Sequence, residues 1–541
     1  MSPNIELRNY SFRTSDTEIW LLKNISLKIE PGERLGITGP SGSGKSTLCQ
    51  VLAGLQSLTL HGSSSGSLLI AGSEIVQPTT LSLEEKFHPI RTGFVLQNPE
   101  SQIFSDTIID EIKYGLLDCS EEKVLQTLRS VQMEHLAYHS TQTLSLGQKQ
   151  RLVIAAFLAT DPQLLILDEP SNFLDAAGAE QLFTLLRTLP MTQIIIEHDL
   201  ERLCEYSDYI IELENGMIAA EGTPPEWLGK TKYHPRFYQV ASAFYTNSAL
   251  EASVPSILLT KLHRKEIKEI TFSSPKKVQD SEQSILECND ITCGYQSGTP
   301  ILRQISFTAS VGERIALLGL NGSGKTTLLK CLCGLIEPWE GSVRIAGEKP
   351  LPKSTGFVYQ NPDYQIFEQT VFYECAFTLR MQRLAEPEIA KRVEFWLKET
   401  GLWELRERLP LTLSYGEKRR LTLASVLVAQ PRIVLFDEPT TALDDQNVQN
   451  LSELFLRLTD QQEIALCFST HDIDFALDTA TRIILLDQGR IVRDLQRTEV
   501  TFHDLSILKM PLPFSCKIYQ NNNANYRPLG TRQLIESMRR Q

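Results

Sequence analysis

Two glycine-rich segments have the residue types and the spacing of a phosphate-binding loop, at residues 39–47 (GPSGSGKST) and 319–327 (GLNGSGKTT). Each segment follows a short apolar run that predicts a strand and precedes a helical pattern, which is the context that such a loop requires. The glycines permit a tight turn whose backbone N–H groups point at phosphate oxygens, and the start of the helix adds partial positive charge. Lys45 and Lys325 would contact the β- and γ-phosphates of a nucleotide. The loop residues predicted to bind it are Gly39, Pro40, Ser41, Gly42, Ser43, Gly44, Lys45, Ser46, Thr47, Gly319, Leu320, Asn321, Gly322, Ser323, Gly324, Lys325, Thr326 and Thr327.

Two acidic pairs follow apolar runs further along the chain. Asp168 and Glu169 come after the run LLIL, and Asp437 and Glu438 come after IVLF. We predict that each aspartate holds Mg²⁺, directly or through water, since carboxylate oxygen is a ligand that this ion prefers. Each glutamate is then predicted to orient or deprotonate the water that attacks the nucleotide.

A glutamine and a histidine complete the set in each half. His198 and His471 follow a further apolar run and are predicted to contact the γ-phosphate. Gln97 and Gln360 each follow a short apolar run and open a loop, from which the side chain can reach Mg²⁺ or the attacking water. The predicted catalytic residues are Glu169, Glu438, His198, His471, Gln97 and Gln360, and the predicted Mg²⁺ ligands are Ser46, Gln97, Asp168, Thr326, Gln360 and Asp437.

The elements that must position these residues occur twice. Every landmark of the first half returns in the same order in the second, which indicates two homologous units. Short apolar runs alternate with helical patterns in each unit, so we predict the α/β class with buried parallel strands. We expect domains at residues 1–228 and 285–500, a linker at 229–284 and a C-terminal tail at 501–541.

The composition narrows the class of protein. The 541 residues carry 53 Lys and Arg against 66 Asp and Glu, a net charge of −13, so no nucleic-acid partner is expected. No uninterrupted apolar run approaches the length of a membrane span, and the first residues lack a signal pattern. The 10 cysteines are scattered and predict reduced thiols.

A further repeated segment, LSLGQKQR at residues 144–151 and LSYGEKRR at 413–420, resembles the Leu-Ser-Gly-Gly-Gln signature of ATP-binding-cassette (ABC) ATPases. Leu146 and Tyr415 depart from this signature, because the family has glycine there. The resemblance covers both units. It implies two tandem P-loop NTPase domains, each with a RecA-like core, an antiparallel β subdomain and a helical signature subdomain.

The resemblance also implies how ATP is bound. In this family two nucleotides are sandwiched between facing domains, so Ser145 would contact the ATP held by Lys325, and Ser414 the ATP held by Lys45. Both halves retain the full set of reactive residues, which predicts two competent sites that hydrolyse ATP with Mg²⁺. The further ATP-binding residues implied by the family are Tyr295, Ser145, Gly147, Gln148, Ser414, Gly416 and Glu417.

The aromatic residue that stacks on adenine in this family is matched in one half only. Tyr295 occupies that position in the second half. The first half has Thr14 there, with Phe12 and Trp20 nearby as substitutes. Adenine stacking in the first half is therefore an open point.

Two similar segments indicate a subfamily. Residues 97–104 (QNPESQIF) and 360–367 (QNPDYQIF) resemble a segment of energy-coupling-factor (ECF) and cobalt/nickel importers. There it forms a groove for a helix of a membrane T-subunit, so the resemblance implies such a groove, a substrate-binding membrane subunit, and a peripheral position on the cytoplasmic face of a prokaryotic membrane. The chain would then be the energy-coupling ATPase for uptake of a vitamin or transition-metal ion. The groove residues are Ile103, Phe104, Ile366 and Phe367.

Two other functions stay open. Tandem-cassette (ABC-F-like) translation factors also carry two cassettes, and residues 171–175 (SNFLD) resemble their D-loop. Their linker is typically long, charged and helical, whereas this linker is mildly basic and contains Pro255. Tandem ATPases of sugar importers usually lose catalytic residues in the second half, and this chain does not.

Overall fold

The computed structural model describes residues 4–14, 19–40, 42–55, 62–74, 90–114, 116, 120–172, 174, 176–232, 284–296, 298–351, 354–441, 443, 445–462, 464–508, 510, 512, 516, 528 and 530. The chain divides into two compact units, Met1–His263 and Arg264–Gln541, and each is described by itself. Most of the predicted linker, residues 233–283, lies outside the described residues, as does most of the predicted tail beyond residue 508.

The first unit is built on a six-stranded sheet. Its central strands are parallel, and one antiparallel strand forms an edge. The strand order is β10 (Met217–Gly222), β9 (Tyr209–Glu214), β3 (Arg34–Thr38), β8 (Thr192–Ile196), β7 (Leu164–Asp168) and β6 (Thr92–Val95). Strands β7 and β8 are buried at every position, as expected for parallel strands covered on both faces.

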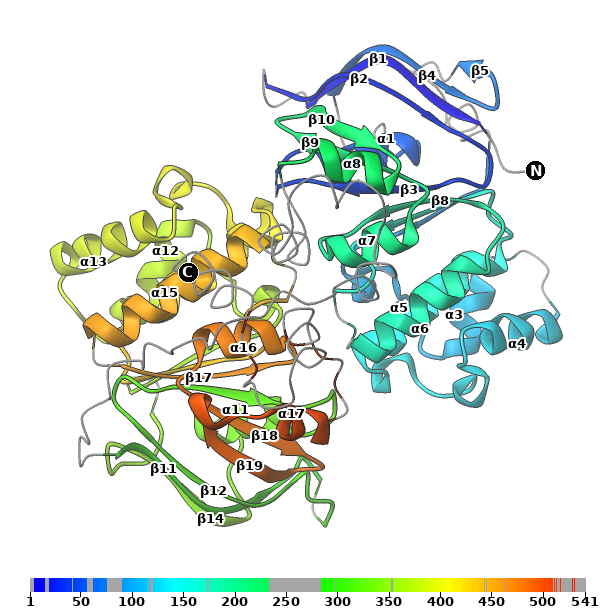
Figure 1. Cartoon of the computed structure of the whole chain (residues 1–541). Helices are drawn as coiled ribbons and strands as arrows, with labels where there is room; N and C mark the ends of the chain where they lie inside the picture. Colours follow the sequence, from blue (N-terminus) through cyan, green and yellow to red (C-terminus); the bar gives the residue numbers. More distant parts are fainter. Residues whose placement is uncertain are drawn as a thin grey trace, which may run out of the picture. The chain divides into compact units, whose positions relative to one another are not determined.

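An antiparallel sheet and a helical part complete this unit (Figure 1). The sheet has the order β2 (Trp20–Ile29), β1 (Ile5–Thr14), β4 (Gly62–Ile70) and β5 (Ser73–Glu74). Helices α3, α4 and α5 pack together around an apolar core of their own. The helices are α1 (Lys45–Leu52), α3 (Ile108–Tyr114), α4 (Glu121–Ser130), α5 (Leu146–Ala159), α6 (Ala176–Arg187), α7 (Leu200–Tyr206) and α8 (Pro224–Lys230), with 3-10 turns at Pro99–Gln102, Glu134–Leu136 and Thr141–Thr143.

The second unit repeats this plan. Its six-stranded sheet has the order β15 (Thr355–Val358), β16 (Ile433–Phe436), β17 (Ala465–Thr470), β13 (Arg314–Leu318), β18 (Arg482–Asp487) and β19 (Arg490–Gln496). The antiparallel sheet has the order β12 (Leu302–Ser310), β11 (Ser284–Cys293) and β14 (Glu340–Ile345). The helices are α11 (Lys325–Leu332), α12 (Val371–Met381), α13 (Glu386–Glu399), α14 (Tyr415–Leu427), α15 (Asp445–Gln462), α16 (Ile473–Thr479) and α17 (Phe502–Ile507), with 3-10 turns at Pro362–Tyr364, Trp403–Leu405, Pro410–Thr412 and Arg497–Glu499.

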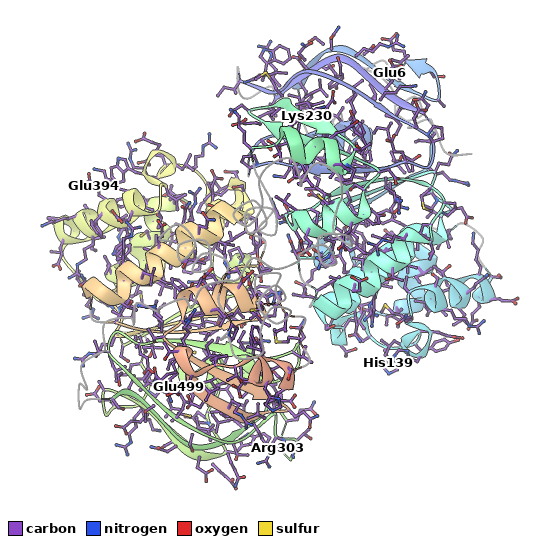
Figure 2. All side chains as sticks on the ribbon, viewed as in Figure 1. Glu6, His139, Lys230, Arg303, Glu394 and Glu499 are labelled. Carbon is purple, nitrogen blue, oxygen red and sulfur yellow. The ribbon has the colours of Figure 1, made fainter. Side chains whose placement is uncertain are left out.

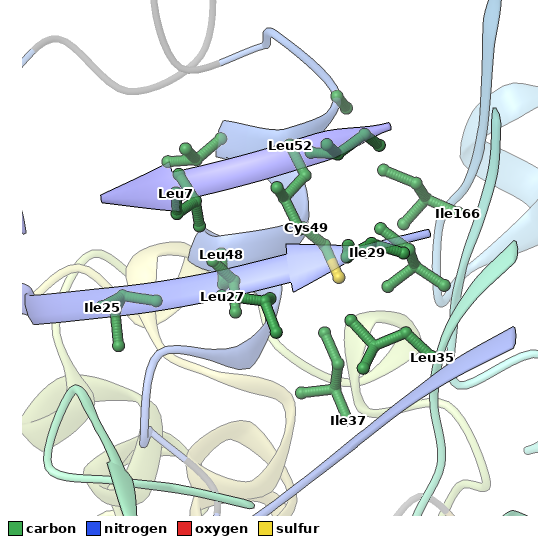
Figure 3. Packing of buried hydrophobic residues seen from close by; sticks show 14 of the residues in the cluster. Leu7, Ile25, Leu27, Ile29, Leu35, Ile37, Leu48, Cys49, Leu52 and Ile166 are labelled. Carbon is green, nitrogen blue, oxygen red and sulfur yellow. The ribbon is translucent and has the colours of Figure 1, made fainter. Parts of the chain in front are cut away.

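One apolar core in the first unit joins the phosphate-loop helix to both sheets (Figure 3). Leu48 and Leu52 of α1 are fully buried among Leu27 of β2 and Leu35 and Ile37 of β3. Burial of each such side chain contributes about 1.5–3 kcal/mol, so this packing holds the start of α1 in a fixed position. Exposed polar side chains such as His139, Lys230 and Arg303 lie on the outside of their units (Figure 2).

The predicted α/β class and the tandem P-loop plan are confirmed, since each unit has a mainly parallel sheet, an antiparallel sheet and a helical part. Within the described ranges, no helix combines the length and the apolar character that crossing a membrane requires.

Candidate functional site

The phosphate loop of the first unit lies between β3 and α1 and folds around its own lysine. Gly44 precedes α1 with a φ of 102°, a left-handed conformation that favours glycine. A Cβ atom at Gly39 would lie 2.1 Å from a backbone carbonyl oxygen, so a larger residue does not fit. The ammonium of Lys45 donates to the carbonyl oxygens of Gly39 at 2.8 Å and Pro40 at 3.0 Å. Ser41 lies outside the described residues.

The loop of the second unit has the same geometry. Gly324 precedes α11 with a φ of 103°. The ammonium of Lys325 donates to the carbonyl oxygens of Gly319 at 2.7 Å and Leu320 at 3.2 Å. Both lysines are 6% exposed, so each loop holds a buried positive charge beside its backbone N–H groups.

One serine in each loop has a buried hydroxyl with no hydrogen-bond partner in the described part of the chain. Ser43 is 4% exposed and Ser323 is 5% exposed, and the Oγ atom of each is unsatisfied. A buried polar atom without a partner costs about 1–3 kcal/mol. The same orphan at the same place in both loops fits a ligand that supplies oxygen atoms, as the phosphates of a nucleotide do.

The predicted Mg²⁺ ligands of the second unit are brought together. The Thr326 hydroxyl donates to Oδ1 of Asp437 at 2.9 Å, and the Ser469 hydroxyl donates to the same atom at 2.7 Å. Asp437 is 4% exposed, and burial raises the pKa of its carboxyl although both hydroxyls oppose the shift. Hydroxyl and carboxylate oxygens are hard donors, so this set fits Mg²⁺.

The first unit has the same hydroxyl–carboxylate pair, but it has no counterpart of Ser469. Ser46 is hydrogen-bonded to Asp168, and burial together with the adjacent Glu169 raises the pKa of Asp168 to about 6. Ile196 lies two residues before His198, at the position that corresponds to Ser469 in the second unit. It offers only a backbone carbonyl, which accepts from the Glu169 N–H at 3.0 Å. Asp168 therefore lacks one of the two donors that hold its counterpart.

Both predicted catalytic glutamates lie in a strained turn directly after their strands. Glu169 has a φ of 51° and Glu438 a φ of 47°, a left-handed conformation that costs a residue other than glycine about 1–2 kcal/mol. They are 8% and 5% exposed. Such strain persists only where the surrounding structure imposes it, and here it directs each carboxylate into the site.

Three donors hold Glu169. Nε2 of His198 lies 2.8 Å from Oε1, and Nε2 of Gln97 donates to Oε2 at 2.5 Å. The Asn172 side-chain amide also donates to Oε2. Burial opposes ionisation, but the neighbouring His198 and Lys45 still lower the pKa of Glu169.

Glu438 is held by its histidine and by the loop lysine. Nδ1 of His471 lies 2.9 Å from Oε2, and the ammonium of Lys325 lies 3.5 Å from Oε1. Burial opposes the shift, yet His471 and Lys325 lower the pKa of Glu438 to about 2. Each glutamate is therefore an anion at neutral pH, the form that can accept a proton from water.

The two predicted glutamines differ in their contacts. Gln97 reaches Glu169 from the loop after β6. For Gln360, the described contacts are those of its backbone carbonyl, which accepts from Tyr415 and Arg419. The structure thus places the Gln97 side chain in hydrogen-bond contact with the catalytic glutamate of its unit.

The two signature segments form the starts of long helices. Ser145 caps α5 and Ser414 caps α14, each in a capping box with the residue three positions later. The side chains of Gln148 and Glu417 accept from the backbone N–H of these serines at 2.9 and 2.8 Å. This local bond explains why either residue type is accepted at the last signature position. Gly416 has open space around it, so close approach of a ligand is allowed there.

The predicted adenine platform of the second unit is exposed. Tyr295 is 59% exposed, and the ammonium of Lys330 lies 5.9 Å from its ring centroid. In the first unit Phe12 is 1% exposed, so it cannot serve as a substitute for this tyrosine. Trp20 is partly exposed, with the Arg13 guanidinium 5.2 Å from its ring.

Sequence reasoning missed several residues of these sites. The Asn172 side chain donates to Glu169, three residues before it, and this short spacing in the sequence could have indicated the contact. Ser469 is a contact of Asp437 across 32 residues, which local spacing does not reveal. Glu197, 1% exposed, accepts from the Ser171 hydroxyl at 2.7 Å, and burial raises its pKa.

Comparisons with known proteins show the family of this chain. The ABC transporter family model matches residues 22–172 and 302–441. A relative from Methanosarcina mazei is 32% identical over 93% of this chain and 91% of its own length, and one from Caldanaerobacter subterraneus subsp. tengcongensis is 33% identical over 90% and 91%. Both carry the provisional name of an ABC transporter ATP-binding protein. The solved structure of cbiO1 from Clostridium perfringens, described as part of the ABC transporter complex cbiONQ, is 31% identical over 42% of this chain and 93% of that chain, with a TM-score of 0.38.

Proposed function

Because this chain belongs to the ABC transporter family, we propose that it is the ATP-hydrolysing subunit of an ECF-type importer, which drives uptake of a vitamin or transition-metal ion through separate membrane subunits. ATP hydrolysis is the activity of the family. The observation that carries it here is a buried, ionised glutamate beside a hydroxyl–carboxylate pair in each unit.

The residues of each unit divide the work of hydrolysis. Lys325 and the N–H groups of its loop would hold the phosphates, and Thr326 and Asp437 would hold Mg²⁺. When bound, the ion would neutralise developing charge on the phosphates. Glu438 would accept a proton from the attacking water, and His471 keeps this carboxylate ionised and fixed. Lys45, Ser46, Asp168, Glu169 and His198 would have the same roles in the first unit.

Exposed aromatic side chains at equivalent positions of the two helical parts support a helix-shaped membrane partner. Phe104 is 71% exposed and stacks on Tyr114 with centroids 5.9 Å apart. Phe367 is 64% exposed and meets Phe377 edge-on at 4.7 Å. Ile366 is buried and Ile103 is packed against the helical core, so the aromatic side chains would form the contact surface.

A buried glutamate carboxylate holds the backbone of the loop that carries each exposed phenylalanine. Glu111 accepts from the backbone N–H groups of Phe104 at 3.0 Å and Ser105 at 2.7 Å. Glu374 accepts in the same way from Phe367 at 3.0 Å and Glu368 at 2.8 Å. A rigid apolar surface of this kind suits an amphipathic helix laid into a groove, such as a cytoplasmic helix of a T-type transmembrane subunit.

The test is an affinity purification of the tagged chain from detergent-solubilised cells, with partners identified by mass spectrometry. We expect small polytopic membrane proteins, including one that binds the cargo. The variants Phe104→Glu and Phe367→Glu should lose these proteins while retaining ATP hydrolysis. Phe395→Glu is the matched control, because Phe395 is 52% exposed on α13 of the same helical part. Recovery of ribosomal proteins without a membrane partner would refute the importer and favour a translation factor.

A further inference from the structure

In the second unit, one buried guanidinium connects the signature helix to the two segments that carry the catalytic residues. Arg419 of α14 is 6% exposed. Its Nη1 donates to the carbonyl oxygen of Tyr359 at 3.2 Å and to that of Gln360. Its Nη2 donates to the carbonyl oxygen of Asp437 at 3.3 Å and to that of Glu438. The planar, charged fork of arginine can make these four bonds at once, which no other side chain can do.

A second residue of the same helix adds to this connection. Tyr415, at the position where the family signature has glycine, donates its hydroxyl to the carbonyl oxygen of Gln360 at 3.0 Å. Tyr415 is the first residue of α14 and directly follows Ser414, which caps the helix. The start of the signature helix is therefore bonded directly to the loop that carries Gln360.

The first unit lacks both bonds. Leu146 and Gln150 occupy the corresponding positions of α5. Gln150 is 1% exposed, and neither its Oε1 nor its Nε2 has a hydrogen-bond partner in the described part of the chain. The side chain of Gln150 is too short to replace a guanidinium. Burial of its amide without a hydrogen bond costs free energy.

One contact between the signature helix and the glutamine loop is common to both units. Lys149 pairs with Glu100 at 2.5 Å, and Lys418 pairs with Asp363 at 2.7 Å. In the contacts that the signature helix makes, the units differ at the tyrosine and the arginine, which add bonds to the backbone at Gln360 and at Glu438 in the second unit.

We propose that Arg419 and Tyr415 are positioning residues that couple the signature helix of the second unit to its glutamine loop and its catalytic glutamate, and that the first unit lacks this coupling. Because the guanidinium bonds both segments, a movement of α14 displaces the backbone at Gln360 and Glu438 together. In the first unit α5 reaches Glu169 only indirectly among the described contacts, through the Lys149–Glu100 ion pair and the Gln97 side chain. The two ATP sites are therefore unequal. This inference rests on the ATPase activity of the proposed function and does not depend on which membrane partner the chain has.

The test compares the full chain with Arg419→Gln, which imports the residue of the first unit, and Tyr415→Phe, which removes one hydroxyl. Amide hydrogen exchange is followed at residues 357–367 and 433–441 without nucleotide and with ATP and Mg²⁺. We expect exchange in Arg419→Gln to rise on the order of tenfold at both segments, since opening of a local unit exposes its amides. Tyr415→Phe should raise exchange more at residues 357–367 than at 433–441, because the hydroxyl bonds the Gln360 carbonyl directly and the second segment only through Arg419. Steady-state kinetics in a Glu169→Gln background, which silences the first site, should show kcat falling on the order of tenfold with an unchanged KM for ATP, because the Lys325 loop is intact.

Two further variants separate positioning from general stability. Arg457→Gln is the control, because Arg457 of α15 also binds the helical part, through Glu399 of α13 at 3.6 Å, but by an exposed ion pair. It should leave exchange and kcat unchanged. Arg419→Lys should recover part of the protection, since it keeps the charge and some of the donors. The reciprocal pair Leu146→Tyr and Gln150→Arg should slow exchange at residues 94–104 and 164–172.

Unchanged exchange at both segments in a folded Arg419→Gln chain would overturn the proposal, and so would a rise in KM alone. If Arg419→Gln does not fold, Arg419→Lys and Tyr415→Phe decide the question by the same measurement. Exchange in the absence of nucleotide reports on positioning even in a chain that hydrolyses ATP slowly, so failure of the proposed function is seen separately, as absence of turnover in the unmodified chain.

Discussion

Nδ1 of His471 lies 2.9 Å from Oε2 of Glu438, and of the two side chains the carboxylate is buried while the imidazole is partly exposed. The contact keeps the carboxylate ionised although its burial favours the neutral acid. A general base needs this anionic form, and it must also be fixed near the attacking water. His198 and Glu169 form the equivalent pair in the first unit at 2.8 Å, through the other ring nitrogen.

Removal of either carboxylate charge should stop turnover at its site. Glu169→Gln and Glu438→Gln keep the size of the side chain but cannot accept the proton, so each should lower the rate of hydrolysis at its own site by about 10²-fold or more. ATP binding, followed by fluorescence of an ATP analogue, should persist in both variants. Full activity in either variant would show that its glutamate is not a base.

The chain should bind two ATP molecules. Lys45 and Lys325 each supply a buried ammonium to a phosphate loop, so removing one should abolish one site and leave the other. Equilibrium binding by isothermal titration should give a stoichiometry of about two for the unmodified chain and about one for Lys45→Ala or Lys325→Ala. A stoichiometry that stays at two in either variant contradicts the assignment of that loop.

Ser469→Ala should damage the second site by two routes. The serine donates to Asp437 and accepts the backbone N–H of Glu438 at 2.8 Å, so its loss leaves a buried N–H without a partner. We expect a loss of about 1–3 kcal/mol of stability together with a clear fall in kcat. Ser452→Ala is the control, since its buried hydroxyl lies 2.9 Å from that of Thr479, away from the site. It should lower the melting temperature without lowering kcat, and equal kcat losses would argue against a special role for Ser469.

The His471–Glu438 pair should also make stability depend on pH. Glu438 raises the pKa of His471 above its ordinary value of 6.5, although burial opposes the shift. The folded state therefore holds this proton more tightly than the unfolded state. The stabilisation is complete below pH 6.5 and is lost as the pH rises through the higher folded value.

Thermal unfolding of the unmodified chain and of His471→Gln between pH 6 and 9 tests this expectation. The melting temperatures should differ by about 2–4 °C at the acidic end, and the gap should narrow with rising pH. His139→Gln is the control, because this histidine is exposed on the surface of the first unit. A gap that is constant with pH would mean that His471 stabilises the fold without its proton.

The sequence alone was sufficient for the parts of the sites that are encoded locally. Lys45 belongs to a strand–loop–helix unit in which the spacing of glycines and lysine dictates the geometry. Asp168 and Glu169 end a wholly buried strand, and parallel strands present their carboxyl ends at one edge of a sheet. The α/β class followed from the same apolar runs, because a strand buried on both faces must be apolar throughout.

Only the tertiary structure decided how these residues are held. The Gln97 amide meets Glu169 across 72 residues, and the Arg419 guanidinium meets the Glu438 carbonyl across 19. Such bonds depend on how a helix packs against a loop, which residue types and spacing do not encode. The two halves carry matching reactive residues in their sequences, yet Ser469 and Arg419 act in one unit while Ile196 and Gln150 stand in the other. A side-chain donor has its effect only when an acceptor is packed within about 3 Å, and that distance is set by the fold as a whole.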